Sequence, residues 1–77
     1  MTRYIVSIKF TGKSDILTQL CVFDAIKKLG TFCIQDQKDR VYILEFKSEL
    51  TQDWLEERFK NLAGPAEVFN YTVCRFD

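Results

Sequence analysis

The chain of 77 residues is long enough for one domain and too short for two, so we expect a single domain over residues 1–77. Hydrophobic residues make up 47% of the chain and aromatic residues 14%, which excludes an intrinsically disordered protein. Eleven Lys and Arg balance eleven Asp and Glu, and His is absent, so the net charge of zero argues against general nucleic-acid binding and favours self-association.

Residues 3–10 alternate between two sets of side chains, with the period of two that a half-buried strand shows. The set expected on the buried face is Tyr4, Val6, Ile8 and Phe10. Ser14 is the expected N-cap of a helix that runs from about Asp15 to Leu29, with Asp15 near the positive end of the helix dipole. Gly30, directly after this segment, is typical of a helix end.

A hairpin is predicted after the first helix. Residues 31–35 form its first strand, residues 36–39 a polar turn and residues 40–47 its second strand. The residues expected on the buried face of that second strand are Tyr42, Leu44 and Phe46. The residues between them alternate onto the opposite face.

A second helix is expected to begin after Thr51, which can act as its N-cap. Its inner stripe is predicted to consist of Leu55, Phe59 and Leu62. Gly64 and Pro65 end this helix, because Gly accepts a left-handed conformation and Pro cannot continue the hydrogen-bond ladder. Residues 66–76 are predicted to form the last strand.

The order of elements is therefore βαββαβ. It predicts an α+β fold, a ferredoxin-like sandwich in which two helices cover one face of a four-stranded antiparallel sheet. The first and third strands are expected in the centre and the second and fourth at the edges. The opposite face of the sheet has no helix to cover it, so its composition bears on function.

The open face of the sheet is the first candidate interaction surface. Its predicted residues on the two central strands are Arg3, Ile5, Ser7, Lys9, Val41, Ile43, Glu45 and Lys47. We expect Ile5, Val41 and Ile43 to lie side by side, surrounded by charged residues, which resembles a binding patch more than a solvated surface. The alternative is that isolated apolar residues here only satisfy β propensity.

The helices offer two further candidates. In the first helix, four apolar residues are expected to face the sheet: Ile16, Leu20, Phe23 and Ile26. Leu17 and Cys21 project away from that direction and form a candidate flank, or pack against the strand edges. In the second helix, Trp54 is either a half-buried residue stacked by Arg58 or an exposed anchor for a partner.

The residue types of the chain argue against an enzyme. Without His, a nucleophile would have only a carboxylate or an amine as its base. We interpret the cysteines as structural thiols, because they lie in apolar segments and form no CxxC pair: Cys21, Cys33 and Cys74. The aspartates are scattered, mostly at predicted caps and turns. We therefore predict no catalytic residue, no cofactor, no metal site and no disulfide scaffold.

The opening segment carries Arg3 and Lys9 and alternates too regularly for the core of a signal peptide. No later segment approaches the roughly 20 apolar residues of a membrane helix. We therefore expect no membrane association and a reducing, cytoplasmic location.

The strand over residues 3–10, the helix end Lys28-Leu29-Gly30 and the βαββαβ order resemble a group of small ferredoxin-like proteins. This group includes the CRISPR-adaptation endonuclease-like subunit and the GhoS-type antitoxin ribonuclease. In its nuclease-like members, the first strand ends in an Asp that helps to hold a metal between two subunits. Lys9 stands at the position that aligns best, so the resemblance implies homodimers rather than family-type metallonuclease activity.

Two functional hypotheses follow. The first is a small non-enzymatic regulator or inhibitor, with phage and host-defence roles among those open, which binds another protein or itself as a homodimer. The alternative is a divergent endoribonuclease or RNA-binding antitoxin-like protein. Residues 40–46 superficially match the third-strand motif of RNA-recognition domains, but their outward residues Val41 and Ile43 are not the aromatic residues that stack on bases.

Overall fold

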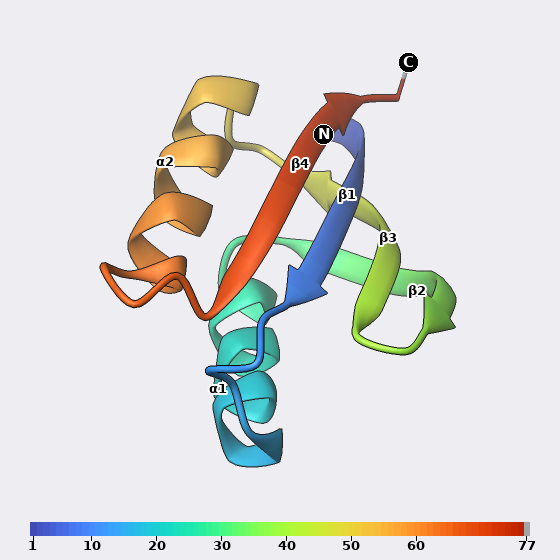
Figure 1. Ribbon diagram of the computed structural model, residues 1–77. Coiled ribbons are helices and arrows are strands. Elements are labelled where there is room, and N and C mark those ends of the chain that lie inside the picture. Colours follow the sequence, from blue (N-terminus) through green and yellow to red (C-terminus); the bar gives the residue numbers. More distant parts are fainter. Residues whose placement is uncertain (77) are drawn as a thin grey trace.

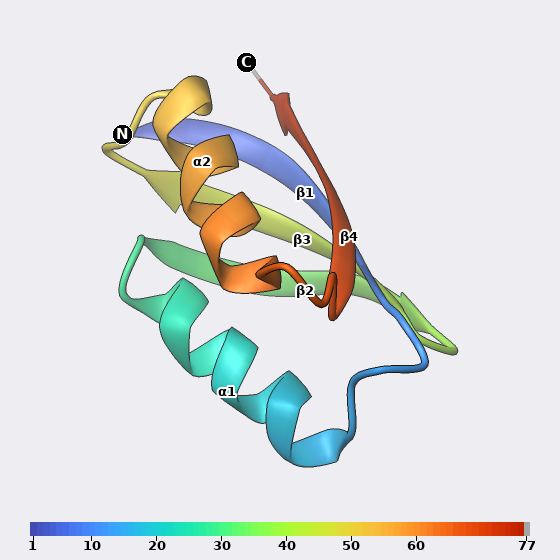
Figure 2. The same cartoon turned by 60° about the vertical axis from the view of Figure 1, so that its left-hand side comes forward.

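The structure is a computed structural model that describes residues 1–76. Its elements are β1 (Thr2–Phe10), α1 (Ile16–Lys27), β2 (Thr31–Lys38), β3 (Val41–Ser48), α2 (Gln52–Ala63) and β4 (Phe69–Arg75). The strands form one antiparallel sheet in the order β2-β3-β1-β4, and both helices lie on the same side of it (Figures 1 and 2). This is the predicted ferredoxin-like arrangement, with the first and third strands in the centre.

The core lies between the sheet and the helices. The alternation predicted for β1 is confirmed, since four side chains are buried on its helix-facing side: Tyr4, Val6, Ile8 and Phe10. On β3, Leu44 and Phe46 are buried next to them. The Phe46 ring meets the Phe59 ring of α2 edge-on, with the ring centroids 6.1 Å apart. These aromatic and aliphatic contacts join α2 to the two central strands.

Helix α2 begins and ends as expected. The Thr51 hydroxyl accepts a hydrogen bond from the backbone N–H of Trp54 at 3.4 Å, and Gly64 follows the helix with a φ of 68°. Its buried residues are Leu55, Phe59 and Ala63. Leu62, predicted to belong to the inner stripe, is only partly buried because Ala63 lies closer to the sheet-facing direction.

The N-terminus of α1 differs from the prediction. Asp15, not Ser14, is the N-cap, and its carboxylate accepts a hydrogen bond from the Thr18 N–H at 2.8 Å. Ser14 is buried, and its hydroxyl donates to the Thr11 carbonyl at 2.8 Å. The Thr18 backbone and side chain donate to the carboxylate and hold the pKa of Asp15 below its ordinary value.

Two strand boundaries also differ from the prediction. Strand β2 extends to Lys38 instead of ending at Gln35, because the register shift between Ile34 and Asp36 lets pairing with β3 continue past Gln35. Strand β4 begins only at Phe69, because the preceding residues form a turn that includes Glu67 at a φ of 51°. Neither of the two described helices has the length and apolar character that crossing a membrane would need.

Candidate interaction surfaces

The open face of the sheet carries less continuous apolar surface than predicted. Three cross-strand pairs on β1 and β3 determine its layout: Ile5 with Glu45, Ser7 with Ile43, and Lys9 with Val41. Ile5 and Ile43 are therefore diagonal neighbours, and Val41 lies beyond Ile43 along β3. All three are partly buried. Ile43 therefore neighbours both Ile5 and Val41, as expected, but Ile5 and Val41 do not lie side by side, because the pair of Ser7 and Ile43 separates them.

Polar and charged side chains dominate the rest of the open face. Arg3, Lys9 and Lys47 are exposed, and the Arg3 guanidinium lies 5.1 Å from the centroid of the Phe76 ring. The Glu45 carboxylate accepts a hydrogen bond of 2.8 Å from the Gln35 amide. The open face thus combines partly buried aliphatic residues with exposed charged residues.

The outer side of α1 is more exposed and more apolar. We define the α1 flank as Ile16, Leu17, Leu20 and Cys21. The exposed fractions of Ile16, Leu17 and Leu20 are 74%, 71% and 56%, and Cys21 is also exposed. Because residues three and four apart share a helix surface, these four side chains are neighbours. The flank is a continuous apolar surface over the first two turns of the helix.

The prediction was wrong for Ile16 and Leu20, which were expected to face the sheet and are exposed. The buried residues of α1 are instead Val22 and Ile26, with Phe23 partly buried beside them. A stripe centred on residues 22 and 26 places position 20 on the opposite side of a helix with 3.6 residues per turn. The predicted outward placement of Leu17 and Cys21 agrees with their exposure.

Phe23 borders the flank and turns toward the sheet. Its ring centroid lies 5.0 Å from that of Tyr42, 5.7 Å from that of Phe10 and 5.9 Å from that of Phe32. Ile34 follows Phe32 on the helix-facing side of edge strand β2, and 52% of it is exposed. It adds apolar surface to the edge of the sheet that carries α1.

Trp54 lies apart from the α1 flank. Its exposed fraction is 57%, which matches the interpretation as an exposed residue better than that of a half-buried one. Figure 1 shows that α2 begins at the opposite end of the molecule from the first turn of α1. Trp54 and the α1 flank are therefore separate surfaces.

The three cysteine thiols are free and exposed, so none of them belongs to the core. Cys33 and Cys74 alternate onto the open face, where they pair with Glu45 and Ile5 respectively. Cys21 points away from the buried stripe of α1. The apolar neighbours of Cys33 and Cys74 in the sequence did not indicate burial, because they alternate onto the helix-facing side of the sheet.

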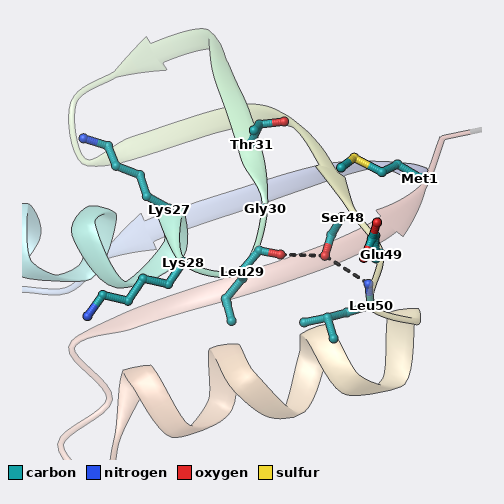
Figure 3. A pocket seen from close by; sticks show the side chains of 9 residues that line it. All are labelled: Met1, Lys27, Lys28, Leu29, Gly30, Thr31, Ser48, Glu49 and Leu50. Atoms are coloured by element: carbon teal, nitrogen blue, oxygen red, sulfur yellow. Dashed lines mark hydrogen bonds between the residues drawn. The ribbon is translucent and has the colours of Figure 1, made fainter.

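A shallow hollow lies where α1 ends and the connection from β3 to α2 begins (Figure 3). The buried Ser48 hydroxyl donates to the Leu29 carbonyl at 2.7 Å and accepts from the Leu50 N–H at 3.1 Å. The side chains of Lys27 and Lys28 extend away from this pair of hydrogen bonds. The hydrogen bonds of Ser48 therefore link the end of α1 to the connection between β3 and α2. The hollow lies between these two segments.

Within residues 1–76, no group of three or more His, Cys, Asp or Glu side chains is placed to hold a metal ion. No protein-family model and no curated protein matches this chain. The resemblance to the endonuclease-like and antitoxin group therefore stays a hypothesis. The fold of this chain is defined by its strand order and register, and its exposed surfaces are the features that bear on function.

Proposed function

We propose that this protein is a non-enzymatic interaction module, a small regulator or inhibitor that self-associates through the α1 flank. The observation that carries this proposal is the exposure of three adjacent large aliphatic side chains, Ile16, Leu17 and Leu20, on one helix surface. Single exposed aliphatic residues are common on protein surfaces, but contiguous apolar patches are rare and mark contact sites.

The exposed surface of the flank favours association. Ile16, Leu17 and Leu20 are each more than half exposed, and covering them with the same residues of a second copy removes apolar area from water on both copies. The loss of translational and rotational freedom opposes association, so we expect a reversible dimer. The net charge of zero adds no long-range repulsion.

The α1 flank is a better contact surface than the open face of the sheet. Ile5, Val41 and Ile43 are partly buried within the monomer, so covering them removes less apolar surface from water. A partner on that face would also have to displace water from Lys9 and the other charged side chains around them. The flank residues Ile16, Leu17 and Leu20 are more than half exposed, and they neighbour one another on the first two turns of α1.

The test is the mass of the full chain in solution, measured by sedimentation equilibrium over a range of concentrations. We expect a reversible dimer of twice the chain mass of 9.1 kDa. Leu17→Glu places a charge in the flank, and we expect it to raise the dimer dissociation constant by about 100-fold or more, as for a central interface residue.

Two matched controls place the same charge elsewhere. Trp54→Glu changes another exposed large side chain, and Ile43→Glu changes the centre of the open face. We expect both variants to dimerise like the unmodified chain. A monomer at all concentrations, or a dimer that Ile43→Glu disrupts and Leu17→Glu does not, would overturn the proposal.

RNA binding or cleavage is the second candidate function, and one observation favours it. The open face carries more cations than carboxylates: Arg3, Lys9, Lys38 and Lys47 against Asp36 and Glu45. Such an excess attracts phosphate backbones. Incubating the purified chain with single-stranded RNA, with and without Mg²⁺, tests this candidate. Cleavage that a chelator abolishes, and that Lys9→Glu reduces, would favour it over the interaction module.

A further inference from the structure

The spacing of residues on α1 points to the geometry of the self-associated state. We infer that the second copy packs its α1 against the first in an antiparallel orientation, across a two-fold axis that passes beside the α1 flank. This inference rests on the proposed function and adds the orientation of the partner. It follows from the order in which apolar and charged side chains occur along the outer surface of the helix.

The outer surface of α1 is divided along its length. Leu17 and Leu20 lie three residues apart on the first two turns, and Asp24 and Lys27 repeat the same pattern one heptad later. Leu17 and Leu20 are apolar and exposed, whereas Asp24 and Lys27 form a solvent-exposed ion pair with their charged atoms 3.8 Å apart. The helix is apolar outside in its N-terminal half and charged outside in its C-terminal half.

A parallel pairing of two such helices brings like residues together. It would place Asp24 beside the partner's Asp24 and Lys27 beside the partner's Lys27, and like charges in these positions are destabilising. The two helix dipoles would also point in the same direction. A parallel arrangement therefore buries the apolar half only at the cost of repulsion in the charged half.

An antiparallel pairing centred on the flank avoids both effects. Leu17 then lies opposite the partner's Leu20, and symmetry repeats this contact on the other side of the axis. The charged half of each helix extends past the contact, toward the N-terminal end of the partner helix. The exposed Lys13 lies just before that end, and its ammonium group suits the carboxylate of Asp24.

The surface also closes, because a two-fold contact uses the same patch on both copies. The flank residues are exposed, and Ile34 on the neighbouring edge strand is 52% exposed, so both copies bring apolar surface to the contact. Because each flank is covered by the flank of the other copy, the same contact cannot add a third copy. A dimer of modest affinity is expected rather than a filament.

Charge complementation between two single variants tests the orientation. Leu17→Glu, Leu17→Lys and Leu20→Lys are prepared separately, one chain of each pair is labelled with ¹⁵N to separate the masses, and native mass spectrometry measures mixed dimers in equimolar pairs. In the antiparallel dimer, Glu at position 17 faces Lys at position 20 of the other chain. We therefore expect the mixture of Leu17→Glu with Leu20→Lys to dimerise at least tenfold more tightly than either variant alone.

The mixture of Leu17→Glu with Leu17→Lys is the matched control, and it should recover less than the first mixture. Stronger recovery in this control would show a parallel dimer, and no recovery in either mixture would show a different geometry. Both results overturn the inference while the dimer of the unmodified chain remains. A monomeric unmodified chain, by contrast, overturns the proposed function itself. Circular dichroism confirms that each variant is folded, as expected for exposed positions.

Discussion

The two helices have the same length of 12 residues and cover the same face of the sheet, but they use their apolar residues differently. Helix α2 is polar over most of its surface and buries the apolar residues Leu55, Phe59 and Ala63. Helix α1 is apolar on nearly all sides and buries only Val22 and Ile26. Its remaining large aliphatic residues lie outside. One helix stabilises the monomer, and the other leaves apolar surface for a contact.

The structure explains why α1 cannot bury both of its sides. A helix on one face of a sheet presents a single stripe to the core, and the stripe of α1 is centred on Val22 and Ile26. Covering the opposite side would require a layer beyond the four strands and two helices that the structure describes. In the proposal above, a second copy covers these apolar residues on the N-terminal half of α1.

The largest expected effect is a change in the free energy of unfolding, which should differ strongly between variants of α2 and variants of the outer side of α1. Phe59→Ala removes a fully buried ring that contacts Phe46 and Tyr71, and we expect it to lower the free energy of unfolding by about 3–5 kcal/mol. Leu20→Ala in α1 removes an exposed side chain and should change the stability of the monomer by less than ~0.5 kcal/mol. Urea denaturation at concentrations that keep the chain monomeric measures both.

The control for this pair is Val22→Ala, which truncates the buried stripe of α1 and should destabilise the monomer, unlike Leu20→Ala. If Leu20→Ala destabilised the monomer as much as Val22→Ala, the outer side of α1 would be packed within the monomer. The contrast between the helices would then be lost.

A smaller effect is expected at the end of α1, where the chain passes close to β3. A Cβ on Gly30 would collide with the backbone carbonyl oxygen of Lys47, and the backbone there cannot easily move because Ser48 binds the Leu29 carbonyl. We expect Gly30→Ala to lower the free energy of unfolding by about 1–3 kcal/mol. Gly12→Ala is the control, since a Cβ there meets no atom within 4 Å. Equal effects at the two glycines, measured by thermal unfolding, would contradict this account.

Most of the fold could be predicted from the sequence, because its strands and α2 follow simple periods. The alternation from Tyr4 to Phe10, the Thr51 cap and the Gly64 end each indicated the observed structure. Ser14 was expected as the N-cap of α1 in place of Asp15, because both side chains can accept from the helix and the local sequence does not distinguish them. The extension of β2 depends on a register shift that no local pattern indicates.

The candidate surfaces were harder to predict. Leu17 and Cys21 were expected to face outward, and they do, but Ile16 and Leu20 were assigned to the core. Because nearly every side of α1 is apolar, its periodicity did not identify the buried stripe. On the open face, the cross-strand register separates Ile5 from Val41, and the register is set by the whole sheet rather than by either strand alone.

The smallest expected effect is a pH dependence that the N-cap of α1, Asp15, should show and the N-cap of α2, Thr51, should not. The hydrogen bonds from Thr18 depress the pKa of the Asp15 carboxyl, so this cap stabilises α1 above the ordinary aspartate value of about 3.9 and is lost as the pH falls through the lower value of the folded state. The Thr51 cap does not titrate. Amide hydrogen exchange should therefore show the first turn of α1 opening more than that of α2 as the pH falls.

Asp15→Asn is the control for this prediction, because Asn caps a helix about as well as Asp and does not titrate. The variant should show no extra opening of α1 in acid. If it opened as the unmodified chain does, the acid response of α1 would arise from another group.

The central claim is that the α1 flank, and not the open face of the sheet, is the contact between copies. Methyl NMR spectra of the unmodified chain over a range of concentrations test it most directly, because each side chain is observed by itself. We expect the signals of Ile16, Leu17 and Leu20 to shift with concentration, while those of Ile5, Val41 and Ile43 stay constant. Shifts confined to the open face, or no shift at any concentration, would contradict the claim.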